Sequence, residues 1–189
     1  MAISEHELWV LSFYRTSEIV GSLFFGRLAR SLSPGQIQID MTKHFADEAL
    51  HAHYWTQCIE SLGAEPVKTK QAYQDQYLEA AGMPANLMEV LAITHIFEQR
   101  VIKQYATHSK ELALRPEVKE TLYKIMDDEK WHIQWVREAL AGMEQKYGKE
   151  MIDDTIGRFR EADAQVYEKT LQELTDRFAI LKAEMRVVA

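Results

Sequence analysis

The sequence predicts an all-α protein: a four-helix bundle with one long crossover connection, followed by a long fifth helix. Three observations carry this prediction. The 189 residues include only four prolines and eight glycines, and both residue types disfavour helix interiors. Apolar residues recur at three- and four-residue steps over long segments. The connections between the first four segments are short, long and short, which suits two antiparallel hairpins joined by a crossover.

The four bundle helices follow from apolar periodicity and from turn residues. The first is predicted from about residue 4 to 30, ending at the Ser31–Gly35 turn, and the second from about 36 to 62, ending at Gly63. The third and fourth are predicted over about 84–109 and 116–147, with Pro84 and Pro116 in their first turns, where proline is tolerated.

The long connection and the C-terminal segment complete the domain plan. The connection, about 64–83, contains QAYQDQYLEAAG, a candidate for a short helix. Residues from about 149 to 185 predict the fifth helix through an apolar stripe of Ile152, Ile156, Phe159, Val166, Leu174, Phe178, Leu181 and Met185. Such a stripe needs a partner surface, either the bundle or a second subunit. We therefore expect a bundle domain over 1–148 and a packing helix over 149–189.

Composition excludes several classes of protein. A formal net charge of −7 disfavours nucleic acid and anionic membrane as main partners, and no apolar run approaches the roughly 18–20 residues needed to span a bilayer. The N-terminal segment lacks a basic stretch ahead of an apolar run, so no secretory signal is expected. The single cysteine, Cys58, rules out an internal disulfide and a cysteine-rich metal site. We expect a cytoplasmic location.

A repeated pattern of acidic residues and histidines marks the candidate site. Asp47-Glu48-x-x-His51 lies in the second helix, and Asp128-Glu129-x-x-His132 lies 81 residues later in the fourth. Glutamate and histidine three residues apart share one face of a helix. Each motif follows a further glutamate in an apolar helix, by 30 or 31 residues: Glu18 and Glu98. Two hairpins related by a pseudo-twofold axis bring all six side chains to one level of the bundle.

The charge of this set predicts its ligand. Four buried glutamates without compensation would protonate or unfold the bundle, whereas two divalent ions neutralise them. Mixed carboxylate and imidazole ligands suit iron, with manganese as the alternative. The neighbouring Asp47 and Asp128 are candidates to orient the histidines from outside the metal ligand set.

The two motifs, DEALHAHYW and MDDEKWHIQWVREAL, resemble those of the ferritin-like di-iron carboxylate family, most closely bacterioferritins and rubrerythrins, over about residues 5–145. The resemblance implies that Glu18 and Glu98 are terminal ligands to one iron each, that Glu48 and Glu129 bridge the pair, and that His51 and His132 each cap one iron.

Departures from the family pattern narrow the expectation. The chain lacks the paired cysteines of a rubredoxin-like domain and has Val101 where rubrerythrins carry an extra glutamate. Ala49 replaces the haem-binding methionine of bacterioferritins, and Phe25 replaces their tyrosine seven residues after the first ligand. We therefore expect two iron ions and no haem, and the long C-terminal helix disfavours a storage shell.

The two halves also differ around the glutamates. Gly21 and Ser22 follow Glu18 at the offsets where Val101 and Ile102 follow Glu98, which predicts either an opening for an oxidant or substrate or merely close helix packing. Tyr105 is the candidate catalytic residue, as an electron or hydrogen-bond donor. His44 and His95, one turn before Glu48 and Glu98, are candidate supporting or substitute ligands or structural polar residues. His53 is expected to face away, and Trp55, Trp131, Trp135, Phe24 and Phe97 to form core and interfaces.

These residues favour an oxidoreductase in which an iron pair reduces dioxygen or peroxide, with an external electron donor and with or without a small organic substrate. The alternatives are a ferroxidase that handles iron, a di-manganese catalase-like protein, and a metal-stabilised structural protein. A deep apolar pocket beside Gly21 would favour a substrate oxygenase. We expect a homo-oligomer, a dimer.

Overall fold

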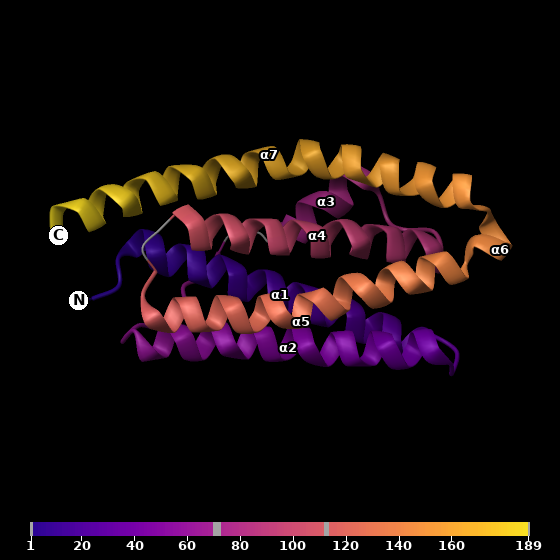
Figure 1. Ribbon diagram of the computed structural model, residues 1–189, viewed down its shortest axis with the longest axis horizontal. Coiled ribbons are helices and arrows are strands. Elements are labelled where there is room, and N and C mark those ends of the chain that lie inside the picture. The colour runs from indigo at the N-terminus through magenta and orange to yellow at the C-terminus, as the bar shows by residue number, and fades with distance from the viewer. Residues whose placement is uncertain (1, 70–72, 112–113, 189) are drawn as a thin grey trace.

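The computed structural model describes residues 2–69, 73–111 and 114–188, and every regular element within them is a helix. The bounds are α1 (Glu5–Ser31), α2 (Gln36–Ser61), α3 (Tyr73–Ala81), α4 (Leu87–Glu111), α5 (Pro116–Gly142), α6 (Glu144–Tyr147) and α7 (Lys149–Val188) (Figure 1). The predicted all-α class is therefore confirmed.

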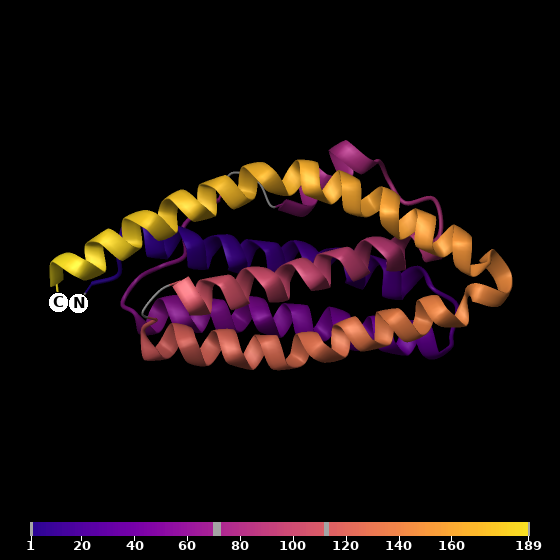
Figure 2. The ribbon, with the colours of Figure 1, turned by 45° about the horizontal axis from the view of Figure 1, so that its top comes forward.

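Two helical hairpins form the body of the molecule. α1 packs on α2, α4 packs on α5, and α2 and α5 join the two pairs, as both ribbon views show (Figures 1 and 2). The short helix expected in the long connection is α3, which packs against α7; residues 70–72 of that connection lie outside the described part of the chain. α1 and α4 keep their backbones farther apart than α1 and α2 do.

Helix α7 packs on this chain's own bundle and lies along α4 and α1. It buries Phe159, Leu174, Phe178 and Leu181 from the predicted stripe, while the side chain of Met185 lies outside the described residues. The bundle thus supplies the surface that the apolar stripe of α7 needs, on the side where α1 and α4 are separated. The expected dimer stays a prediction.

Two predicted helix ends are wrong for local reasons. α4 begins at Leu87, so Pro84 precedes the helix. The Asn86 side chain accepts a hydrogen bond from the Glu89 amide (3.1 Å), and the Glu89 carboxylate accepts one from the Ala85 amide (2.9 Å). This reciprocal capping fixes the start of the helix.

The fourth predicted helix was expected to run unbroken to Tyr147, but α5 ends at Gly142 and a single turn, α6, follows. Glycine weakens a helix interior. Gly148, at φ 80°, then ends α6 in a left-handed backbone conformation that favours glycine.

The core consists of two apolar clusters with a polar layer between them. One includes Tyr14 of α1 and Trp55 of α2, and the other includes Phe25 of α1 and Met41 of α2. On each of these helices the predicted metal-binding residues lie between the two clusters in the sequence. Apolar packing on both sides keeps water from this layer, which raises the cost of any uncompensated charge there.

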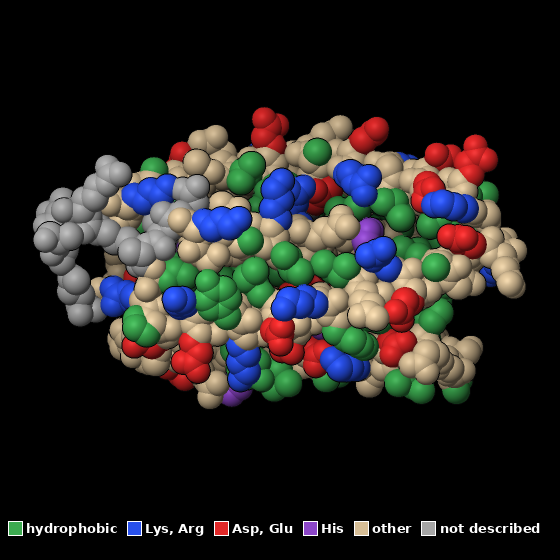
Figure 3. Space-filling model, in the orientation of Figure 1, with side chains coloured by type: hydrophobic (Ala, Val, Ile, Leu, Met, Phe, Trp, Pro, Cys, Tyr) green, Lys and Arg blue, Asp and Glu red, His purple; other side chains and the backbone are tan. Residues whose placement is uncertain are grey.

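The surface in Figure 3 carries acidic and basic side chains interspersed, with hydrophobic side chains exposed between them. On the described part of this face the basic groups form no continuous stripe. Within the described residues, none of the helices combines the length and the apolar character that crossing a membrane requires.

Candidate metal centre

The six predicted ligands come together in one buried layer, each less than 6% exposed. They come from four helices: Glu18 from α1, Glu48 and His51 from α2, Glu98 from α4, and Glu129 and His132 from α5. Their ligand atoms fall into two groups of four, each group within 4.8 Å: Glu18, Glu48, His51 and Glu129; and His44, Glu48, Glu98 and His132.

Glu48 and Glu129 occupy the middle of the layer. Glu48 belongs to both groups. Glu129 directs one oxygen to each histidine, with Oε1 3.3 Å from Nδ1 of His51 and Oε2 2.8 Å from Nδ1 of His132. Glu18 and Glu98 lie farther out, 3.9 and 3.8 Å from the same two Nδ1 atoms. This arrangement has two central carboxylates and one outer carboxylate at each end.

Each histidine is held by an aspartate from the opposite hairpin. Nε2 of His51 lies 3.3 Å from Asp128, and Nε2 of His132 lies 3.3 Å from Asp47. The aspartate of each motif therefore orients the histidine of the other motif. Such a carboxylate fixes the tautomer and the ring orientation of a histidine whose other nitrogen binds a metal.

The residues present fit a pair of metal ions. Nδ1 of His51 and Oε1 of Glu129 are buried without a hydrogen-bond partner, although buried polar atoms nearly always have one. The two atoms lie 3.3 Å from each other, and their residues belong to the same group of candidate ligands. Four glutamates and two imidazoles supply ligands that suit iron or manganese.

The charges of the metal-free protein explain why this layer needs compensation. Burial and the neighbouring Glu129 and Glu48 carboxylates together raise the pKa of Glu98 to about 8, although His44 opposes them. Burial alone would lower the pKa of His132, but Glu129, Asp47 and Glu98 outweigh it and raise the pKa to about 11. Protons therefore balance part of the negative charge that two cations would neutralise.

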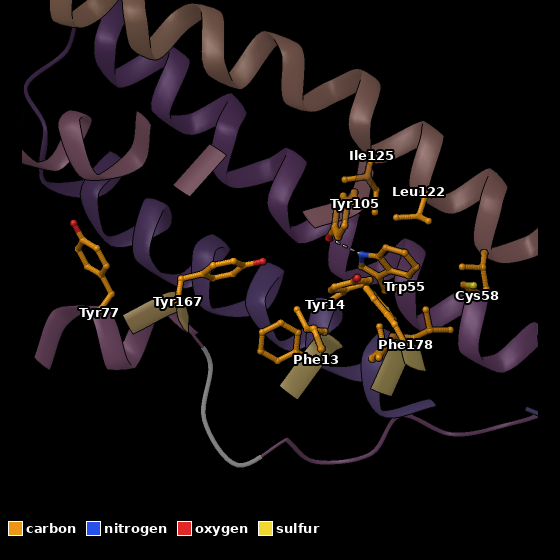
Figure 4. Packing of buried hydrophobic residues seen from close by; sticks show 14 of the residues in the cluster. Phe13, Tyr14, Trp55, Cys58, Tyr77, Tyr105, Leu122, Ile125, Tyr167 and Phe178 are labelled. Atoms are coloured by element: carbon orange, nitrogen blue, oxygen red, sulfur yellow. Dashed lines mark hydrogen bonds between the residues drawn. The ribbon is translucent and has the colours of Figure 1, made fainter. Parts of the chain in front are cut away.

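Tyr105, the predicted catalytic residue, supports the outer carboxylate of α1. Its buried hydroxyl donates a hydrogen bond to Oε1 of Glu18 and accepts one from the indole N–H of Trp55 at 3.1 Å. Figure 4 shows the Trp55 indole nitrogen directed at the Tyr105 hydroxyl. The chain Trp55–Tyr105–Glu18 holds this carboxylate in place.

His44 supports the outer carboxylate of α4. The indole N–H of Trp135 donates to Nδ1 of His44 at 3.2 Å, so a neutral His44 carries its proton on Nε2. That nitrogen lies 3.1 Å from Glu98 and 3.2 Å from Glu48. A metal bound to Nε2 would require a proton on Nδ1, where Trp135 already directs its own N–H. The hydrogen bonds thus favour a supporting role over a ligand role for His44.

Gly21 makes room for a central carboxylate. A Cβ atom at this position would lie 2.7 Å from Oε2 of Glu48, which is closer than non-bonded atoms approach. Gly21 also lines a cavity, whereas Ser22 is buried outside it. Of the two predicted small residues, only Gly21 borders a space beside the carboxylates.

The cavity has a volume of about 70 Å³ and lies between α1 and α4. Glu18, Glu48 and Glu98 line it, while the two histidines and Glu129 do not. Most of its other lining is apolar: Phe13, Val20, Phe24, Phe25, Ile93, Phe97 and Val101. The cavity therefore offers space for a small molecule next to Gly21 and these three carboxylates.

The remaining residues named in the sequence analysis either lie outside the two ligand groups or support residues that hold a carboxylate. His95 is buried but belongs to neither group of ligands, and its Nε2 accepts from the Gln99 amide at 3.1 Å. His53 is exposed, as expected. Trp55 and Trp135 were expected only to pack, yet each donates a hydrogen bond to a residue that holds a carboxylate. Their positions, four residues after His51 and three after His132, were the available signal.

No protein-family model matches this chain, and no curated protein or solved structure matches it either. The class of this protein therefore rests on its structure: it is a helical protein, and its buried groups of glutamate and histidine form a candidate metal site.

Proposed function

We propose that this chain adopts the ferritin-like arrangement of two helical hairpins and is a di-iron oxidoreductase that activates dioxygen or peroxide. The observation that carries the proposal is the pair of buried four-residue groups that share Glu48. Isolated acidic clusters are common on protein surfaces, whereas these groups come from four helices and are shielded from water. When bound, the iron pair supplies the electrons that reduce the oxidant.

The protein's own residues hold and shield the reacting site. His51 and His132, fixed by Asp128 and Asp47, present Nδ1 inward. Tyr105 and His44 donate hydrogen bonds to the outer carboxylates and limit their movement. The apolar clusters on both sides exclude water, which would otherwise compete with the oxidant.

The cavity favours oxidation of an organic substrate over iron handling. An iron-transporting route is expected to carry polar or acidic groups along its length, because it must carry a hydrated cation. This cavity is walled mainly by phenylalanine, valine and isoleucine up to the carboxylates. An apolar molecule gains free energy by leaving water for such a space.

The test is an anaerobic titration with Fe(II), followed by dioxygen or peroxide under optical and Mössbauer observation. We expect two irons per chain and a ferric absorption band that forms in a single turnover. The Glu129→Ala variant should lose both irons, whereas the exposed Glu120→Ala should retain them. Continued oxidation of many irons per chain would indicate a ferroxidase. Binding of zinc alone, or of no metal, would refute the proposal.

A further inference from the structure

Arg100 is the one basic residue among those that line the apolar cavity over the metal-binding carboxylates. It lies on α4, two residues after Glu98, with its side chain 19% exposed. A second cavity of about 70 Å³, between α4 and α7, is also lined by Arg100 and by Gln104. Arg100 and Gln104 therefore line both cavities, and the first cavity is otherwise lined by apolar, acidic and neutral polar side chains.

The guanidinium of Arg100 retains hydrogen-bonding capacity. One terminal nitrogen pairs with Oδ2 of Asp163 on α7, and the guanidinium lies over the Tyr167 ring, 3.8 Å from its centroid. Its Nε is buried without a hydrogen-bond partner, and so is Oδ1 of Asp163. The pair thus lacks the two-point geometry that arginine and a carboxylate usually adopt. A buried N–H donor beside a cavity is a binding position for an acceptor.

We propose that the two cavities bind an aliphatic carboxylic acid, with its carboxylate at Arg100 and its hydrocarbon chain directed along the apolar walls toward Glu18 and Glu98. The assignment of this ligand as the substrate rests on the proposed function, whereas its binding does not.

The size and chemistry of the space select this class of ligand. An engineered protein cavity of about 150 Å³ accommodates benzene, so a cavity of about 70 Å³ is suited to a short alkyl chain and is too small for an aromatic ring. The Arg100 guanidinium favours an anionic head group over an alcohol or amine. A dicarboxylate is disfavoured because its second negative charge would lie near Glu18, Glu48 and Glu98, which line the cavity.

Binding to the metal-free protein tests this inference independently of any redox reaction. Calorimetric titration with butanoate, butan-1-ol and benzoate should give butanoate the highest affinity. Because a hydrogen bond to a charged group contributes roughly 1.5–3 kcal/mol, Arg100→Gln should weaken butanoate binding about tenfold to a hundredfold. The same change should leave butan-1-ol binding within about threefold. Arg158→Gln, which removes an exposed arginine of α7, should change neither.

Two further variants keep the test decisive if Arg100→Gln folds poorly. Asp163→Asn retains the arginine and removes its competing carboxylate, so butanoate should bind more tightly. Val101→Phe fills the cavity and should weaken both butanoate and butan-1-ol. Equal affinity for butanoate and butan-1-ol in the wild type would overturn the inference, and so would butanoate binding that Asp163→Asn and Val101→Phe leave unchanged. Binding of two irons without butanoate binding would leave the proposed function standing and this inference refuted.

Discussion

His108 provides a quantitative test of the packing between α7 and the bundle. Its ring, on α4, is 1% exposed. Nδ1 lies 3.2 Å from the hydroxyl of Tyr14, and the ring stacks on Phe178 of α7 with centroids 4.8 Å apart. Burial lowers the pKa of His108 from 6.5 to about 4, so the folded protein holds this imidazole in its neutral form.

The shift makes stability depend on pH with a definite sign. Between pH 6.5 and 4 the unfolded chain protonates His108 and the folded chain does not, so the unfolded state binds more protons. The stability present above pH 6.5 is therefore lost as pH falls toward 4. Each pKa unit corresponds to about 1.4 kcal/mol, which gives a total of about 3 kcal/mol, of which about 2 kcal/mol is lost by pH 5.

Urea unfolding of the metal-free protein at pH 7 and pH 5 measures this loss. We expect the wild type to lose about 2 kcal/mol more than His108→Phe between the two pH values. Each protein is compared with itself at the two pH values, so the pH-independent effect of replacing the ring on the free energy of unfolding cancels. The exposed His53→Phe should lose as much as the wild type. Equal losses in wild type and His108→Phe would show that burial does not hold His108 neutral.

Three further predictions concern the metal centre. Gly21→Ala should force the central carboxylate of α2 to move and should weaken Fe(II) binding at least about tenfold. The control Gly157→Ala, whose Cβ would meet nothing within 4 Å, should leave Fe(II) binding unchanged. Anaerobic Fe(II) titration measures the affinity of both variants. Asp128→Asn should lower metal affinity roughly 10- to 100-fold by releasing the histidine of α2, while the adjacent Asp127→Asn should have no effect in the same titration. Tyr105→Phe should lower the free energy of unfolding of the metal-free protein by about 1–3 kcal/mol, because a buried carboxylate and a buried indole N–H each lose a partner; unchanged urea unfolding would contradict this.

The clustering of the six candidate ligands could be predicted because their sequence signal is local and repeated. A three-residue step places glutamate and histidine on one face of any α-helix, whatever its neighbours. The second copy of the motif and the two upstream glutamates then fix which faces turn inward. Apolar residues around Glu18 and Glu98 required these helices to be buried, so the carboxylates had to be buried together.

The supporting contacts could not be predicted in the same way, because they depend on the register between helices. The sequence identified Asp47 and Asp128 as residues that orient the histidines. It did not show that each aspartate orients the histidine of the other hairpin. Gly21 was predicted either to provide an opening or to permit close helix packing, but not to make room for the Glu48 carboxylate, which its missing side chain also does. A shift of one helical turn between α1 and α2 would remove that contact without changing any sequence pattern.

The internal repeat makes the two candidate metal positions alike, but the rest of the structure makes them different. The outer carboxylate of α1 receives its hydrogen bond from the phenol of Tyr105, and that of α4 from the imidazole of His44. Burial lowers the pKa of His44, so both donors are neutral, but they are shared differently. The Tyr105 hydroxyl donates to the outer carboxylate of α1, whereas Nε2 of His44 lies 3.1 Å from the outer carboxylate of α4 and 3.2 Å from the central carboxylate of Glu48. The first outer carboxylate thus has a donor of its own, and the second shares its donor with a central carboxylate. We therefore expect the two ions to bind with unequal affinity, so that Mössbauer spectra of protein loaded with one equivalent of ⁵⁷Fe(II) show one dominant site, and equal filling of both would contradict the asymmetry.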